Sequence, residues 1–243
     1  MNDRTKKLTT LAMLTALSYL VVATIRIPVV MFLKYEPKDV IITIGGFIFG
    51  PIEGFLISAV VSLIEMASVS DTGVIGAIMN LVSTSAFVLP AAIIYRRNRT
   101  LKGAVIGLVT AVFVMTGVML LWNYLLTPIY MGYPREAVAA LLVPVFLPFN
   151  LLKGGLNAVI TMLLYKPVVT GLRKAHLVPA AKSSAAEEAE KQTQDTKTAE
   201  EGENANAVSN KKDHRKVSGL VILVSSILLI TFVLLMLVLA GKI

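Results

Sequence analysis

The polar residues best suited to bind a ligand lie inside a long apolar stretch, residues 138–165. Asn150, Lys153 and Asn157 have the spacing i, i+3, i+7, which places an ammonium between two amides on one face of a helix. Lys153 lies far from both ends of the stretch, and the stretch contains no acid to pair with it. This face must point into the protein, either as a structural lysine bonded to helix-end carbonyls or as donors and acceptors for a polar ligand.

A charged segment, residues 34–39, joins the first two apolar stretches. Acids in the first turn are normal for a helix that starts at a proline, so Glu36 and Asp39 are predicted either to cap that helix or to bind a polar solute. Tyr35 in the same segment offers a ring to stack on a flat ligand. Thr43, one turn deeper, is predicted either to point into the site or to bond its own backbone.

Two more amides, Asn80 and Asn123, are predicted to line the same pocket, because an amide offers both a donor and an acceptor to the edge of a heterocycle. Trp122 belongs either to that pocket or to the aromatic belt at a membrane surface. Glu65 and Asp71 are predicted to be solvated or to cap helices, since two carboxylates alone do not make an acid–base site.

Composition places the chain in a membrane and removes most kinds of catalysis. Of its 243 residues, 56% are hydrophobic and 16% are charged, which leaves too few polar groups to cover a soluble domain. The absence of cysteine excludes thiolate nucleophiles, cysteine-ligated zinc and iron–sulfur clusters. Both histidines, His176 and His214, follow the main apolar block, so no imidazole is available at membrane depth. The sequence therefore predicts no catalytic residue, no metal site and no enzyme.

The apolar stretches are long enough to predict an all-α, polytopic membrane protein. They are residues 8–25, 40–49, 55–69, 75–95, 104–126, 138–165 and 217–240. Gly50 and Pro51 predict a tight bend between the second and third stretches, with one kinked or re-entrant element as the alternative. We expect a six-helix substrate-binding domain in residues 1–174, a flexible cytoplasmic linker in 175–216 and a seventh, C-terminal transmembrane anchor helix in 217–243.

The net charge of +8 is attributed to membrane topology and anionic lipid, with no inference of nucleic-acid binding. With the N-terminus in the cytoplasm, the short inner loops collect most of the basic residues, at positions 4–7, 96–102 and 166–174. The outer side then carries the charged segment 34–39. A multi-pass protein of the plasma membrane with a cytoplasmic N-terminus is the predicted arrangement.

Several short motifs, taken in order, resemble the riboflavin-specific S components of energy-coupling factor (ECF) vitamin transporters. They are Ala12-x-x-x-Ala16, Lys34-Tyr-Glu-Pro-Lys-Asp-Val40, Gly45-Gly-Phe-Ile-Phe-Gly-Pro51, Trp122-Asn-Tyr124 and Asn150-Leu-Leu-Lys153-Gly-Gly-Leu-Asn157. The resemblance covers about residues 5–174. The linker and the seventh helix depart from it, and that helix is expected to be a lipid-facing anchor or, alternatively, a regulatory or partner-binding helix.

The resemblance implies a six-helix membrane subunit of a bacterial vitamin importer that captures riboflavin, its transported ligand, outside the cell and uses no cofactor. It implies partners in a transmembrane coupling subunit and two cytoplasmic ATPases. Ala12 and Ala16 would dock on the coupling subunit, and the loop around residues 29–39 would act as a lid. Among the pocket residues, Lys153, Asn123 and Asn150 rank first.

Two other functions stay open at the level of sequence. The same S-component fold serves other vitamins, for instance thiamin, biotin or a queuosine precursor. A small membrane enzyme or a stand-alone secondary carrier is the second alternative. The missing His and Cys at membrane depth argue against the enzyme, and the scarcity of intramembrane acids argues against an ion-coupled carrier.

Overall fold

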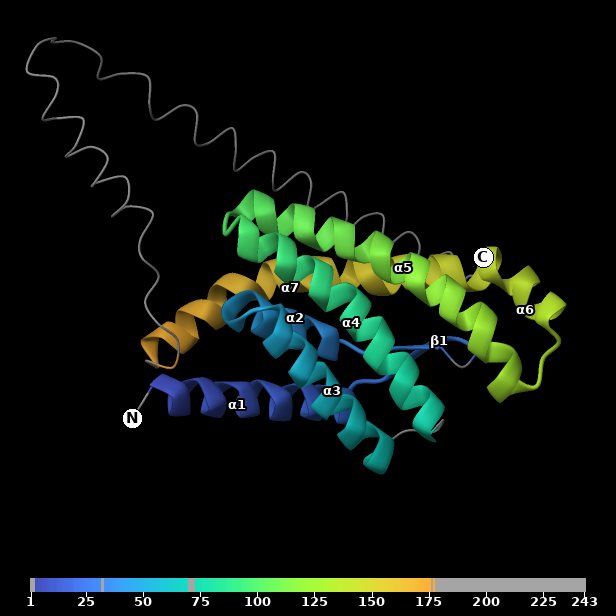
Figure 1. Ribbon diagram of the computed structural model, residues 1–243, viewed down its shortest axis with the longest axis horizontal. Coiled ribbons are helices and arrows are strands. Elements are labelled where there is room, and N and C mark those ends of the chain that lie inside the picture. The colour runs from blue at the N-terminus through green and yellow to red at the C-terminus, as the bar shows by residue number, and fades with distance from the viewer. Residues whose placement is uncertain (1–2, 32, 70–72, 176, 178–243) are drawn as a thin grey trace, which may run out of the picture.

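The computed structural model describes residues 3–31, 33–69, 73–175 and 177, which form a helical bundle with one small hairpin (Figure 1). The helices are α1 (Asp3–Thr24), α2 (Lys38–Phe49), α3 (Pro51–Ser68), α4 (Gly73–Arg97), α5 (Leu101–Met131), α6 (Arg135–Leu141) and α7 (Leu147–Lys174), with a π-helical turn, η1 (Leu142–Phe146), before α7. Strands β1 (Ile27–Val30) and β2 (Leu33–Tyr35) pair antiparallel. Apart from residues 175 and 177, the predicted linker and the seventh helix lie outside the described residues.

The described helices confirm an all-α membrane protein. Within the described residues, five stretches are long and apolar enough to cross a membrane: Arg4–Thr24, Pro51–Ser68, Gly73–Arg97, Leu101–Ile129 and Arg135–Leu172. Helix α2, which was expected to be a sixth span, has 12 residues and extends only about 18 Å at 1.5 Å per residue. It is therefore shorter than the roughly 30 Å of a hydrocarbon core and does not cross one alone.

Helix α2 lies inside the bundle, in contact with α1, α3, α4 and α7 (Figure 1). Nine of its 12 residues are buried. It ends at Gly50, whose φ of 126° lies in the region that favours glycine, and Pro51 then occupies the first turn of α3. The predicted bend between the second and third apolar stretches is confirmed, and we call this end of the bundle the bend end.

The opposite end, which we call the hairpin end, has its own apolar cluster. Leu33 of β2 packs with Val138 of α6, Phe146 of η1 and Phe149 of α7. The larger cluster of the bundle runs through α1 to α5 and α7. Because the hairpin leads directly into α2, its packing fixes where the first turn of α2 lies between the helices.

Close contact between α2 and α3 depends on glycine. A Cβ added at Gly54 would lie 2.8 Å from Cγ1 of Val88 and 3.2 Å from Cα of Gly46. The first distance is too short for a Cβ, so the side chain of Val88 on α4 would have to shift, and the second would require α2 to give way by a few tenths of an ångström.

Replacing Gly54 by Leu is expected to lower the free energy of unfolding by about 1–3 kcal/mol, the usual cost of overpacking. The matched control is Gly117→Leu on α5, where an added Cβ meets nothing within 4 Å. Thermal unfolding of the two variants in detergent measures the difference. Equal stability of the two variants would show that α2 and α3 can separate without cost.

Candidate ligand-binding site

One buried carboxylate, that of Asp39, joins three helices at the hairpin end. Thr84 of α4 donates a hydrogen bond to Oδ1 over 2.7 Å. Asn157 of α7 donates from Nδ2 to Oδ2 over 3.1 Å, and Nζ of Lys153 lies 3.5 Å from the same oxygen. Asp39 and Asn157 have no exposed surface, and Lys153 is 5% exposed. The carboxylate thus supplies the counter-charge that α7 lacks in its own sequence.

The predicted face of α7 is confirmed as buried. Asn150, Lys153 and Asn157 are each at most 5% exposed. Lys153 also donates to Oγ of Ser83 over 3.2 Å, and Asn150 donates from Nδ2 to the carbonyl of Phe146 over 2.7 Å. A bond from the amide nitrogen to the preceding turn directs the other end of the Asn150 amide, an acceptor, away from that turn.

Tyr35 connects the hairpin to this face. Its hydroxyl donates to Oδ1 of Asn157 over 3.1 Å, and its ring is 6% exposed. Burial, together with the nearby charge of Asp39, raises the pKa of the Tyr35 phenol above its usual value. The phenol therefore stays protonated and keeps its role as donor throughout the physiological range. We call Tyr35, Asp39, Ser83, Thr84, Lys153 and Asn157 the Asp39 cluster.

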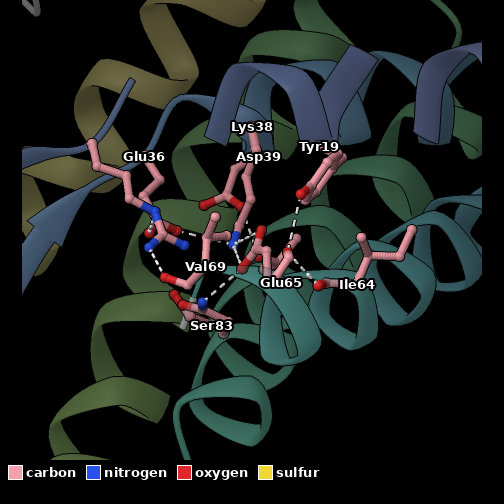
Figure 2. Close-up of polar contacts among 12 residues, drawn as sticks. Tyr19, Glu36, Lys38, Asp39, Ile64, Glu65, Val69 and Ser83 are labelled. Carbon is pink, nitrogen blue, oxygen red and sulfur yellow. Dashed lines mark hydrogen bonds and ion pairs between the residues drawn. The ribbon is translucent and has the colours of Figure 1, made fainter. Parts of the chain in front are cut away.

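Four charged residues form a second group beside the Asp39 cluster (Figure 2). They are Arg26, Glu36, Lys38 and Glu65, and we call them the ionic chain. Nζ of Lys38 lies 2.6 Å from both carboxylate oxygens of Glu65 and 2.9 Å from Oε2 of Glu36. Nε of Arg26 lies 3.3 Å from Oε1 of Glu36. Signs alternate along the chain, so its net charge is zero.

The burial of Glu65 corrects the prediction that this residue is solvated or caps a helix. Glu65 is 1% exposed and accepts hydrogen bonds from Lys38 and from Nδ2 of Asn80, the latter over 2.9 Å. An acid within an apolar helix needs a buried cation, and the cation comes from α2, which is distant in sequence. Asp71, the other acid in that prediction, lies outside the described residues.

Six of the predicted ligand-binding residues lie outside the Asp39 cluster: Glu36, Thr43, Asn80, Trp122, Asn123 and Asn150. Thr43 donates to the backbone carbonyl of Asp39 over 2.6 Å, which was one of its two predicted roles. Asn123 is fully buried, and its amide donates to the carbonyl of Met119 over 2.7 Å. Trp122 packs against the larger apolar cluster. Their roles in binding stay predictions.

Sequence reasoning missed Ser83 and Thr84, which hold Lys153 and Asp39 from α4. Both side chains are at most 2% exposed. Adjacent hydroxyls inside an apolar stretch were the available signal, but hydroxyls often bond their own helix, so type and position alone do not single them out.

Ala12 and Ala16 lie on an exposed strip of α1. Large apolar side chains flank them, with Leu8 61%, Met13 43% and Leu17 45% exposed. The strip has small side chains at its centre and large apolar side chains at its edges, so another helix can approach it closely.

No group of three or more His, Cys, Asp or Glu side chains within the described ranges is arranged to hold a metal ion. Hydrogen-bond donors in the Asp39 cluster come from Lys153 and Tyr35, and α7 adds the amide of Asn157.

Comparisons with known proteins agree on one family. A family model described as "ECF transporter, substrate-specific component" matches residues 6–165. The Staphylococcus aureus (strain TCH60) protein named riboflavin transporter RibU is 30% identical over 182 residues, which cover 71% of this chain and 95% of that protein. Riboflavin transporter FmnP of Bacillus subtilis (strain 168) is 28% identical over 189 residues, 72% of this chain and 99% of the relative. A solved structure described as the S component of a bacterial ECF transporter has a TM-score of 0.60 and 28% identity, and the match covers 70% of this chain and 98% of that one.

Removing either charge of the Asp39–Lys153 pair is expected to destabilise the protein. Asp39→Asn and Lys153→Met each leave the other charge buried without its partner, at a cost of about 3–5 kcal/mol. The double variant leaves no unpaired charge and should lose less than the sum of the two single variants. Denaturant unfolding in detergent gives all three values, and strict additivity would show that the two groups do not interact.

Proposed function

This chain belongs to the family of substrate-specific components of ECF transporters, and we propose that it captures riboflavin at the outer face of the cell membrane for an ATP-driven importer. The observation that carries the proposal is the Asp39 cluster, a buried group of donors and acceptors in a protein whose relatives are named riboflavin transporters. The chain acts as a binding subunit and not as an enzyme.

The chemistry of riboflavin suits the donors and acceptors of α7. The uracil-like edge of isoalloxazine alternates donors with acceptors, and the ribityl tail carries hydroxyls. Lys153 only donates hydrogen bonds, whereas the amides of Asn150 and Asn157 both donate and accept them. The buried face of α7 can therefore pair with donors and with acceptors of the flavin. In the proposal, Asn123 and Asn80 serve further polar atoms, and Tyr35 and Trp122 pack on the rings.

In the proposed orientation the bend end faces the cytoplasm and the hairpin end faces outside. Basic residues support it, because Arg96, Arg97 and Lys166 lie towards the bend end on α4 and α7. The Asp39 cluster then lies near the outer surface, where the vitamin arrives. The N-terminus is cytoplasmic in this orientation.

Delivery inside requires partners, which we propose to be a transmembrane coupling subunit and two cytoplasmic ATPases. No P-loop motif G-x-x-x-x-G-K-[ST] occurs in the sequence, so ATP hydrolysis is assigned to another chain. The exposed strip around Ala12 and Ala16 is the proposed contact with the coupling subunit.

Titration of the full chain in detergent with riboflavin tests the capture function. Saturable, one-to-one quenching of flavin fluorescence is expected. Lys153→Met should weaken binding by about ten-fold or more, the effect of losing a charged hydrogen bond of about 1.5–3 kcal/mol. The control is Lys166→Met, an exposed lysine on the same helix, which should bind as the unchanged chain does.

No flavin binding by a folded, monodisperse sample would contradict the vitamin assignment, and tight binding of thiamin or biotin in its place would identify a different cargo. Unchanged affinity in Lys153→Met would remove this lysine from the pocket.

Docking on the coupling subunit is tested at Ala16. Ala16→Trp fills the small centre of the α1 strip, so uptake by cells or by vesicles that contain the complete transporter should be abolished while riboflavin affinity stays unchanged. Ile106→Trp is the control, because Ile106 is 56% exposed on α5, away from α1 (Figure 1). Loss of riboflavin binding in Ala16→Trp would instead mean that the alanine serves packing within the chain.

A further inference from the structure

Residues 35–39 send side chains to two different sides. Tyr35 and Asp39 belong to the Asp39 cluster and contact α7, whereas Glu36 and Lys38 belong to the ionic chain and pair with Arg26, just before β1, and with Glu65 of α3. Figure 2 shows Lys38 and Glu36 directed towards Glu65 and its neighbours. Residues 35–39 thus supply Tyr35 and Asp39 to the proposed site. The ion pairs of Glu36 and Lys38, which lie outside the Asp39 cluster, hold the same segment on its other side.

We propose that Glu65 is a positioning residue that prolongs the residence of bound ligand by acting through Lys38. The proposal rests on the proposed riboflavin-binding function. Among the described residues, the hydrogen bonds and ion pairs shown for Glu65 go to Lys38 and Asn80, and neither of these belongs to the Asp39 cluster.

The Lys38–Glu65 pair is built to resist displacement. Both partners are 1% exposed, and both carboxylate oxygens of Glu65 lie 2.6 Å from the Lys38 ammonium. Asn80 of α4 donates to Oε2 over 2.9 Å and so holds the Glu65 carboxylate with a second hydrogen-bond donor. Away from water such a pair is much stronger than at a surface, and separating it leaves two buried charges without partners.

The rest of the ionic chain fixes the base of the hairpin. Arg26 precedes β1 and Glu36 follows β2, so their ion pair joins the two ends of the hairpin. Arg26 also donates to the backbone carbonyl of Val69, just beyond α3. Both ends of the hairpin are therefore attached to the same end of α3.

Loss of the charge on Glu65 is expected to act on Tyr35 and Asp39 through the backbone. Lys38 directly precedes Asp39, so a shift of the Lys38 ammonium towards Glu36 moves the first turn of α2. The side chains of the Asp39 cluster themselves remain chemically unchanged. We therefore expect faster dissociation, with little change in the rate of association, because changes within one interface act mostly on dissociation.

The test is stopped-flow measurement of riboflavin binding by the full chain in detergent. Glu65→Gln retains the shape of the side chain but removes its charge, and dissociation should become about ten-fold faster or more while association changes by less than about two-fold. The matched control is Glu53→Gln on the same helix. Glu53 pairs with Lys7 over 2.5 Å at the bend end, and its loss should leave both rates unchanged.

Two further measurements separate positioning from a general loss of stability. Amide hydrogen exchange of the ligand-free protein should become faster in residues 33–40 of Glu65→Gln and stay unchanged in α5. The variant Lys38→Met/Glu65→Leu replaces the buried pair by apolar side chains, which often preserves stability, and should still release riboflavin about ten-fold faster.

Unchanged dissociation in either folded variant, or the same acceleration in Glu53→Gln, would overturn the role of Glu65. Failure of the unchanged chain to bind riboflavin would instead contradict the proposed function. In that event the exchange rates of residues 33–40 still decide whether Glu65 holds the segment, and unchanged rates would reject it.

Discussion

Charge buried inside an apolar bundle has to be balanced within the bundle, and the first turn of α2 is where this balance is made. Lys38 and Asp39 are adjacent and opposite in sign, and each is at most 1% exposed. Lys38 is neutralised by Glu65 of α3 on one side, and Asp39 neutralises Lys153 of α7 on the other. Two neighbouring residues thereby attach one short helix to both halves of the molecule.

This arrangement explains how α2 keeps its place although it is too short to cross a membrane. Its apolar residues fill the space between α1, α3, α4 and α7, and its charged first turn is attached on two sides. At its other end, Gly50 turns the chain directly into α3. Ion pairs of this kind contribute little net stability compared with apolar packing, but they penalise any arrangement that leaves one charge alone. They therefore specify position more than they add free energy.

The parts of the site that follow from local spacing were predictable, and the parts that depend on tertiary contacts were not. The buried face of α7 was predicted from the i, i+3, i+7 pattern, and the bend was predicted from Gly50 and Pro51. The pairing of Asp39 with Lys153 joins residues far apart in the sequence, and helix periodicity carries no information about which helices become neighbours. Glu65 was predicted to be solvated or to cap a helix for the same reason, since its cation lies on α2.

The bend end differs from the hairpin end in a way that bears on transport. There Phe47 stacks on Tyr95 at 4.5 Å between ring centroids, and Tyr165 meets both rings edge-on. The hydroxyls of Tyr95 and Tyr165 lie 2.5 Å apart, so α4 and α7 are joined by a hydrogen bond as well as by ring contacts. A solute moving from the Asp39 cluster straight to the bend end would have to separate three aromatic rings from α2, α4 and α7. Because these rings join three helices at the bend end, passage of a solute from the proposed site to that end requires movement of more than a single side chain.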